Sequence, residues 1–366
     1  FGLVSAGFFR CWSAAKHHHG DQRGFMVSSS QLLPAGKLPL PLLEKLLQRF
    51  TPDDPRIVVG PRAGEDAAVF DFGDRYLVAK TDPITFATNE IGWYAVNVNA
   101  NDIAVMGAEP RWFLATVLLP AGQASPEMAE AIFAQIHGAC AALGISLAGG
   151  HTEITIGLDR PIISGTMLGE VAPDRLITTA GAQVGDAVLL VKPAPIEGAA
   201  LIALERVAAL RARGYSPAFI ERAQNFLHEP GISVVAPARL ALAAAAVHAM
   251  HDPTEGGVLT GLLEIARAAQ VGLTIALDAI PLLPEGVVLC REFGLDPLGT
   301  IASGAILMTA AEADASRLVE ALAVEGYPAA MIGRVTPPEA GLVALRDGQR
   351  VPWPLFPADE ITKLFA

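Results

Sequence analysis

Two acidic residues of this chain stand at the ends of predicted strands, where side chains can reach a ligand. Asp66 lies where a glycine-bearing loop enters an apolar strand, and Asp82 follows the strand that ends at Lys80. Pro83 keeps the backbone extended after Asp82. Each motif is, by itself, also typical of a turn, so both interpretations stay open at this point.

A third acidic residue lies inside a predicted helix over residues 91–106. Residues 97–102 read Asn-Val-Asn-Ala-Asn-Asp, and Asn and Asp are poor residues for a helix interior. Asp102 shares a face with the apolar Ala95 and Val105 at helical spacing. A carboxylate on a buried face needs a partner, and a cation is the simplest one. This motif therefore favours a functional role.

A pair of glycines follows the predicted strand over residues 144–147. Gly149 and Gly150 permit close backbone approach to a ligand, and His151 and Glu153 point the same way at strand spacing. A Gly-Gly turn is common, so a purely structural role remains open.

A second glycine pair, Gly256 and Gly257, opens a predicted helix over residues 257–269. The first turn of a helix carries free backbone N–H groups and the positive end of the helix dipole, which suits phosphate. The alternative is that Asp252 or Thr254 simply caps the helix.

Taken together, these motifs predict a magnesium site that serves a phosphate-bearing ligand. Mg²⁺ commonly joins a few carboxylates to substrate phosphates, and Asp66, Asp82 and Asp102 supply such oxygens. The sequence has no Walker-type P-loop and no dinucleotide fingerprint, so a nucleotide site would be of another kind.

The elements that position these motifs predict two α/β domains in 366 residues. An amphipathic helix over residues 38–50 begins the first domain, and a hairpin, two helices and further strands follow. A composition change and a fresh strand at 187–191 indicate the boundary to a helix-rich second domain. We expect a leader over residues 1–33, an N-terminal domain over 34–172, a C-terminal domain over 173–340 and a C-terminal tail over 341–366.

Composition limits the classes of protein. Apolar residues make up 52% and charged residues 17% of the chain, which predicts a globular fold with a large core. The formal charge of −12 argues against non-specific binding to nucleic acid or an anionic membrane. The uncharged run over residues 131–152 is broken by polar residues and glycines, so we expect no membrane span. Three cysteines without metal-like spacing favour the cytoplasm, and the apolar excess favours a homodimer.

In order and spacing, the motifs resemble the aminoimidazole ribonucleotide (AIR) synthetase (PurM)-like superfamily, and most closely its hydrogenase-maturation branch, HypE. The most specific stretch is Asn101-Asp102-Ile103-Ala104-Val105-Met106-Gly107-Ala108-Glu109-Pro110. The motifs that accompany it are Gly64-Glu65-Asp66-Ala67-Ala68, Lys80-Thr81-Asp82, Gly149-Gly150-His151-Thr152-Glu153 and His251-Asp252-Pro253-Thr254-Glu255-Gly256-Gly257.

The resemblance implies an N-terminal domain that forms a dimeric β-barrel with its twin, a C-terminal α/β domain, and ATP near the dimer cleft. Enzymes of this kind use ATP to phosphorylate an amide or carbonyl oxygen, and HypE dehydrates a thiocarbamate to a thiocyanate. By carry-over, the Mg²⁺ ligands are Asp66, Asp82 and Asp102, and the catalytic candidates are His151, Glu153 and Asp252. The residues assigned to ATP binding are Gly64, Glu65, Asp66, Lys80, Asp82, Asn101, Asp102, Gly149, Gly150, Thr152, Gly256 and Gly257.

Two departures from the HypE pattern leave the acceptor open. HypE carries its substrate on a C-terminal cysteine, whereas residues 359–366 contain none, and His151 stands where relatives often have a carboxylate. We therefore expect an ATP-dependent enzyme acting on a free or protein-borne amide or carbamoyl group. The alternatives are a HypE-type dehydratase with a partner thiol and a nucleotide-binding dimer without turnover.

Overall fold

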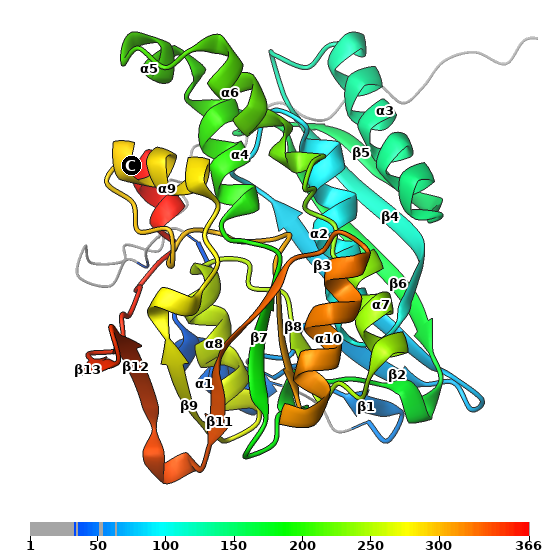
Figure 1. Cartoon of the computed structure of the whole chain (residues 1–366). Coiled ribbons are helices and arrows are strands. Elements are labelled where there is room, and N and C mark those ends of the chain that lie inside the picture. Colours follow the sequence, from blue (N-terminus) through cyan, green and yellow to red (C-terminus); the bar gives the residue numbers. More distant parts are fainter. Residues whose placement is uncertain (1–32, 34–35, 51–53, 63, 366) are drawn as a thin grey trace, which may run out of the picture. The chain divides into compact units, whose positions relative to one another are not determined.

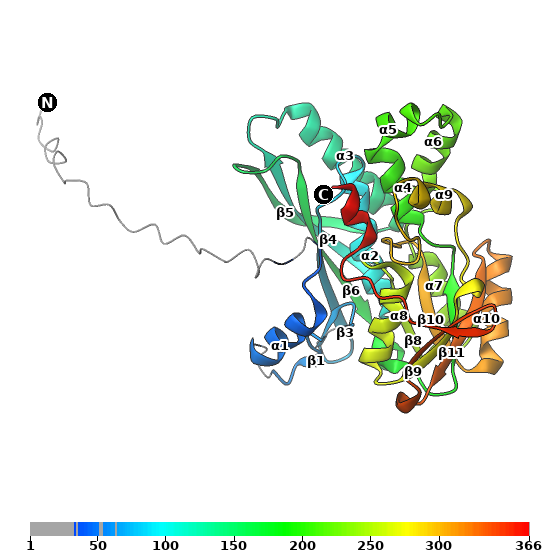
Figure 2. The same cartoon turned by 90° about the vertical axis from the view of Figure 1, so that its left-hand side faces the viewer.

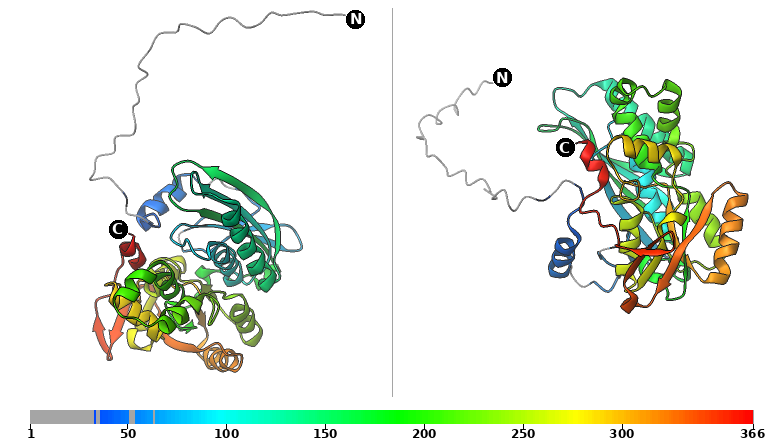
Figure 3. Two further views of the ribbon diagram at one scale, coloured as in Figure 1. Left: turned by 90° about the horizontal axis from the view of Figure 1, so that it is seen from above. Right: turned by 60° about the vertical axis from the view of Figure 1, so that its left-hand side comes forward.

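The computed structural model describes residues 33, 36–50, 54–62 and 64–365. The described residues from Gly36 onward form one compact unit (Figure 1). The leader predicted over residues 1–33 lies outside the described residues except for Leu33. The described part contains two sheets with helices packed on each, which confirms the predicted two-domain α/β class (Figure 3). No helix among the described residues is long and apolar enough to cross a membrane.

The first sheet has six strands in the order β1-β2-β3-β6-β4-β5, with β4 and β5 parallel and the other neighbours antiparallel. Helix α2 packs on β3, β4 and β6, and α3 packs on α2 and β5 (Figure 2). The strands are β1 (Ile57–Val59), β2 (Ala68–Asp71), β3 (Tyr76–Ile84), β4 (Glu109–Pro120), β5 (Ser146–Thr155) and β6 (Ile162–Val171). The helices are α1 (Leu40–Phe50), α2 (Ile91–Val105) and α3 (Pro126–Leu143).

The predicted hairpin is confirmed, and local chemistry also explains where α3 begins. Strand β2 pairs with β3 in antiparallel register from Ala68 opposite Ala79 to Asp71 opposite Tyr76. Ser125 caps α3, because its side chain accepts a hydrogen bond of 3.2 Å from the amide of Met128. This local chemistry was readable from the sequence alone.

The asparagines inside α2 are explained by their amide hydrogen bonds. Asn99 accepts from the backbone N–H of Asp82 at 2.9 Å and donates to the Ala95 and Asp82 carbonyls, so it links α2 to β3. Asn101 donates to the carbonyl of Ile232 and accepts from the N–H of Val234, both at 2.8 Å. A buried amide so paired avoids the cost of an unmet hydrogen bond. Helix α2 thereby holds β3 and the 232–234 loop together.

The second sheet has seven strands in the order β13-β12-β9-β11-β7-β10-β8. Every residue of β7 is buried, because α10 packs with Leu189 and Val191 on one face and α8 packs with Val188 and Leu190 on the other. The strands are β7 (Ala187–Val191), β8 (Ala249–His251), β9 (Gly272–Ala276), β10 (Ile306–Ala310), β11 (Ala329–Thr336), β12 (Leu342–Arg346) and β13 (Gln349–Val351). The helices are α4 (Ile196–Glu205), α5 (Val207–Ala212), α6 (Pro217–Gln224), α7 (Val235–Ala244), α8 (Gly257–Ala268), α9 (Pro284–Glu292) and α10 (Glu312–Val324).

The prediction of a turn at Gly149 and Gly150 is wrong. Both residues lie within the continuous strand β5, which runs on from the strand expected over residues 144–147. A side chain at Gly150 would place its Cβ 2.0 Å from the carbonyl oxygen of Ala115 on β4. Glycine is therefore required here by close strand packing, a signal that resembles a turn in sequence.

The C-terminal segment 341–366, expected as a tail, contributes to the second sheet. Strand β12 pairs in parallel with β9, and β13 pairs with β12. Further on, Asp359 is buried and accepts hydrogen bonds from the backbone of Gly256 and Ile301. The segment from Trp353 to Asp359 therefore returns to the region where α8 begins.

The buried Lys192 fixes the loop that Asn101 contacts. Its Nζ donates to the carbonyls of Gly231 at 2.6 Å and Ser233 at 3.0 Å. Lys192 is 1% exposed. Burial lowers the pKa of Lys192 to about 8, while Asp252 opposes that shift. Without this amine the two carbonyls would be buried without a partner.

We predict that Lys192→Met lowers the free energy of unfolding by about 1–3 kcal/mol, since carbonyls lose a charged donor. Urea unfolding of the full chain measures this. Lys45→Met, at an exposed position on α1, is the matched control and is expected to change little. Equal stability of the Lys192 variant and the wild type would contradict the loop-fixing role.

Candidate active site

Lys80 on β3 brings two of the predicted carboxylates together. Its Nζ lies 3.4 Å from Asp102 Oδ2 and 3.5 Å from Asp82 Oδ2. Burial opposes the charge on Lys80, but Asp102 and Asp82 outweigh burial and raise its pKa. Burial also raises the pKa of Asp102 well above its ordinary value, against the opposing effect of Lys80. The site thus holds a cation between two acidic groups.

Asp66 is paired with His251, the last residue of β8. His251 Nδ1 lies 2.8 Å from Asp66 Oδ1, and its Nε2 lies 3.0 Å from Glu264 Oε2 on α8. Thr179 donates a further hydrogen bond of 2.9 Å to Asp66 Oδ2. Burial would lower the pKa of His251, but the two carboxylates raise it to about 10. His251 is therefore an imidazolium that holds Asp66 in place.

Asp252 is a buried carboxylate without a hydrogen-bond donor. It is 1% exposed, and neither Oδ1 nor Oδ2 accepts a hydrogen bond from any residue in the described part of the chain. Burial and the charge of Asp66 raise its pKa to about 7. Asp102 Oδ2 is also buried and accepts no hydrogen bond, but Lys80 Nζ lies 3.4 Å from it. Such oxygens carry a high desolvation cost unless a cation binds them.

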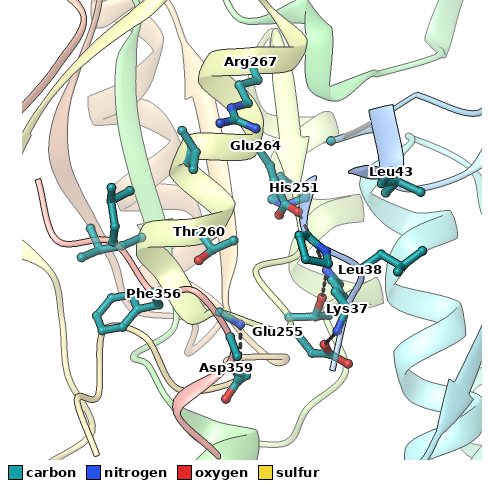
Figure 4. A pocket seen from close by; sticks show the side chains of 18 of the residues that line it. Lys37, Leu38, Leu43, His251, Glu255, Thr260, Glu264, Arg267, Phe356 and Asp359 are labelled. Atoms are coloured by element: carbon teal, nitrogen blue, oxygen red, sulfur yellow. Dashed lines mark hydrogen bonds and ion pairs between the residues drawn. The ribbon is translucent and has the colours of Figure 1, made fainter. Parts of the chain in front are cut away.

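A cavity of about 430 Å³ is lined by Asp66 and Asp102, but not by Asp82 or Asp252. Figure 4 shows Thr260, Glu264 and Arg267 on α8 along one side, with Lys37 and Asp359 nearby. Lys37 donates from its backbone N–H to Glu255 and from Nζ to Thr254. The site residues predicted from the sequence that also line this cavity are Gly64, Glu65, Asp66, Lys80, Asp102 and Gly256.

The carboxylate oxygens of the cluster fit a divalent cation that is also coordinated by water or phosphate. Across the described residues, no three His, Cys, Asp or Glu side chains already form a closed metal cage. The oxygens of Asp252, and Asp102 Oδ2 beside Lys80, are nevertheless hard donors of the kind that Mg²⁺ binds. Since Mg²⁺ usually keeps water or phosphate ligands as well, an incomplete protein cage suits it.

The structure does not bring the β5 residues to this cavity. Gly149, Gly150, His151, Thr152 and Glu153 are exposed, and they line neither this cavity nor its neighbour. His151 Nε2 and Glu153 Oε2 lie 3.5 Å apart, so both side chains point the same way as predicted. Within one chain they have no contact with the acidic cluster.

The start of α8 is already occupied by a carboxylate of the chain. The backbone N–H of Gly256, predicted to receive phosphate, donates to Asp359 at 2.5 Å. The N–H of Gly257 donates to the carbonyl of Thr254. A side chain at Gly257 would bring its Cβ 2.6 Å from the carbonyl oxygen of Leu298. Gly257 therefore permits close packing, and Gly256 binds Asp359 of the C-terminal segment.

Sequence reasoning missed several residues of the cavity wall. Thr260, Glu264 and Arg267 recur at helical spacing on the otherwise apolar α8, a signal that was available. Lys37 precedes the first helix without a motif, and Thr179 lies in a short turn between the two sheets. Only the three-dimensional fold places these two beside the acidic cluster.

Comparison with known proteins places this site in a family. Residues 64–171 match the model of the AIR synthase related protein N-terminal domain, and residues 183–344 match the C-terminal domain. The chain belongs to the AIR synthase related family. A hydrogenase expression/formation protein of Methanocaldococcus jannaschii is 30% identical over 78% of this chain and 83% of that protein.

Other members of the AIR synthase related family carry different activities in their names. Carbamoyl dehydratase HypE of Rhodobacter capsulatus is 31% identical over 75% of this chain and 77% of its own. Selenide, water dikinase of Paraburkholderia xenovorans is 33% identical over 68% of each chain. The predicted family and its HypE-like relatives are thus confirmed.

Solved structures of the family share the fold. A HypE–HypF complex aligns with a TM-score of 0.68 at 21% identity, covering 86% of this chain and 99% of that one. HypE in complex with ATP aligns with a TM-score of 0.65 at 24% identity, covering 85% and 92%.

We predict that the His251 ion pairs make the metal-free chain less stable as the pH rises. The folded pKa of about 10 lies above the ordinary 6.5, so the stabilisation is complete below about pH 6.5 and is lost through about pH 10. The difference in unfolding free energy between wild type and His251→Gln should therefore shrink over this range. Urea unfolding at both limits, without nucleotide or Mg²⁺, measures it.

The exposed His137→Gln on α3 is the control, and it is expected to give no comparable change between the two limits. A difference for His251→Gln that stays constant with pH would show that His251 is not held as an imidazolium.

Proposed function

We propose that this chain is an ATP-dependent enzyme that phosphorylates an amide-like or carbonyl oxygen. The observation that carries the proposal is the buried pair of carboxylates Asp102 and Asp252: Asp252 accepts no hydrogen bond within the described residues, and Asp102 Oδ2 has only the Lys80 ammonium, at 3.4 Å. Asp102 also lines a cavity of about 430 Å³, which is large enough for a nucleotide. The enzyme names of its relatives support the same chemistry.

The acidic cluster would hold Mg²⁺ between the protein and the phosphates. Asp66, Asp82 and Asp102 are the proposed ligands, with Asp252 as a further carboxylate of the cluster. Bound Mg²⁺ lowers the negative charge that repels an attacking oxygen. Lys80 neutralises Asp82 and Asp102 before the metal arrives and can then turn to a phosphate oxygen.

The reaction on a primary amide proceeds in two steps, phosphorylation of the oxygen and departure of phosphate. The amide oxygen bonds to the γ-phosphorus of ATP while the bond to the β,γ-bridging oxygen breaks, and ADP leaves. Departure of the phosphorylated oxygen as phosphate, with loss of both N–H protons, converts a primary amide to a nitrile. Attack by an internal nitrogen instead closes a ring. A carbamoyl group is the acceptor that the named HypE relatives favour.

We extend the proposal to a homodimer that joins through β5. This ten-residue strand lies at an edge of the first sheet, and its exposed side chains include Leu147 and Ile154. A long exposed edge strand invites pairing with another strand. Pairing with a second copy would extend the open sheet toward the barrel that the family resemblance implies. It would also offer Gly149–Glu153 to the partner's cavity.

We predict that Asp82→Asn and Asp102→Asn each weaken Mg²⁺-dependent ATP binding at least about tenfold, because a ligand carboxylate loses its charge. Calorimetry of the full chain with Mg²⁺ and with EDTA measures the effect. Asp174→Asn, at an exposed position, is the matched control and should bind normally. Unchanged affinity in both cluster variants would falsify the metal assignment.

ATP turnover separates the enzyme from a nucleotide-binding dimer. ADP release by the wild type is expected to increase with an amide or carbamoyl acceptor from a chemically varied panel. Binding of ATP without stimulation by any acceptor would instead favour the dimer without turnover.

We predict that Ile154→Asp converts the dimer to a monomer, since burying an unpaired carboxylate in an apolar strand interface is costly. Sedimentation velocity of the full chain measures this. Val324→Asp, at a position that is 83% exposed at the end of α10, is the control and should not change the oligomer. A wild type that sediments as a monomer would contradict pairing through β5.

A further inference from the structure

A second cavity, of about 410 Å³, lies beside the proposed nucleotide cavity. The two cavities share Lys37, Thr254 and Glu255 in their walls. Asp82, at one end of the acidic cluster, lines the second cavity. A molecule bound there would therefore lie next to the place where phosphate is proposed to bind.

The second cavity contains two buried polar groups that the acidic cluster does not use. Glu197 is 5% exposed and Ser303 is fully buried, and both line the cavity. Neither Glu197 Oε2 nor Ser303 Oγ makes a well-aligned hydrogen bond to the residues that the structure describes, although Ser303 lies close enough to Glu197 to act against the rise of its pKa. Polar atoms this buried are nearly always satisfied, which points to a missing ligand or water.

The backbone holds Glu197 and Ser303 in one place. The N–H of Gly198 on α4 donates to the carbonyl of Ile301 at 3.1 Å. A side chain at Gly198 would bring its Cβ 2.5 Å from Thr300, so glycine permits this close approach. The start of α4 is thereby fixed against the 300–303 loop, and the two polar groups are positioned before any ligand arrives.

The charges around the cavity disfavour an anion. Asp82 and Glu255 line it, against one amine, that of Lys37, while burial raises the pKa of Glu197 to about 8. Lys37 itself is engaged, because its Nζ donates to Thr254 and lies 3.9 Å from Glu264 Oε1. A phosphate or carboxylate would meet like charge at low dielectric.

The remaining wall is apolar and suits a small organic group. Phe86, Leu201 and Ile301 line it. The ring of Phe86 is positioned by Phe365, because the two rings stack with centroids 5.6 Å apart. A few polar groups within an apolar wall are the usual composition of a small-molecule site.

We propose that this second cavity binds the acceptor, and that the acceptor is a small, uncharged molecule with amide N–H groups. Its N–H groups donate to Glu197 Oε2 and Ser303 Oγ, while its carbonyl oxygen faces the Asp82 end. The proposal rests on the proposed function and names the substrate class for it. It excludes acceptors that carry a phosphate or carboxylate near the reacting oxygen.

The test uses propionamide and propionate as matched probes of nearly equal shape. Ligand-detected NMR measures their binding to the full chain, alone and with Mg²⁺ and a non-hydrolysable ATP analogue. The wild type is expected to bind propionamide in the millimolar range and propionate at least about tenfold more weakly. Equal or tighter binding of propionate, or no binding of propionamide, would overturn the proposal.

Substitution of Glu197 tests the residue itself. Glu197→Met is expected to weaken propionamide binding at least about tenfold, because the buried acceptor is lost. Glu197→Gln keeps a carbonyl acceptor and should restore most of the affinity. Glu221→Met, at an exposed position on α6, is the control. Wild-type affinity in Glu197→Met would rule out Glu197 as the binding group.

Nucleotide binding separates this proposal from the proposed function. Glu197 does not line the first cavity, so the ATP analogue should bind the Glu197 variants with wild-type affinity. Thermal unfolding of each variant establishes that it is folded. A protein that binds the ATP analogue but not propionamide would contradict the acceptor site alone. A protein that binds propionamide but not the ATP analogue would contradict the proposed function alone.

Discussion

Mutual repulsion among buried carboxylates is the constraint on which the rest of this structure depends. Asp66, Asp102 and Asp252 are each at most 6% exposed, and each raises the electrostatic cost of the others. Two cations relieve part of that cost: Lys80 lies beside Asp102, and His251 binds Asp66. The balance remains incomplete, because Asp252 has no donor within the described residues. A fold that tolerates such a cluster is one that gains from binding a metal.

The amides of α2 make this arrangement possible. Asn99 links the helix to β3, which carries Lys80 and Asp82, and Asn101 links it to the 232–234 loop. The acidic cluster therefore lies where strands of the first sheet meet β8 of the second. Neither region alone contains the complete set, so assembling the site requires both to fold. Buried amide pairs of this kind favour one arrangement, because any slip leaves them unsatisfied.

The two cavities divide the chemistry between them. The first combines basic side chains with carboxylates proposed to bind Mg²⁺, which suits a nucleotide. The second is smaller, more apolar and acidic, and its buried polar groups are Glu197 and Ser303. Their shared wall at Lys37, Thr254 and Glu255 allows two ligands to meet. Relatives in this family act on different acceptors, and the second cavity is where such differences would be encoded.

The sequence alone determined the two α/β domains, the bounds of the helices predicted over residues 38–50, 91–106 and 257–269 to within two residues, and the residues of the acidic cluster. Hydrophobic period, caps and turn residues act over a few positions, so they can be read locally. Asp102 could be predicted as buried because its helix neighbours are apolar. The tertiary structure alone decided that Gly150 packs in a strand, that Asp359 occupies the start of α8, and that Glu197 lies beside Ser303. Those contacts join positions far apart in the chain, and no local pattern records which distant residue will fill a given space.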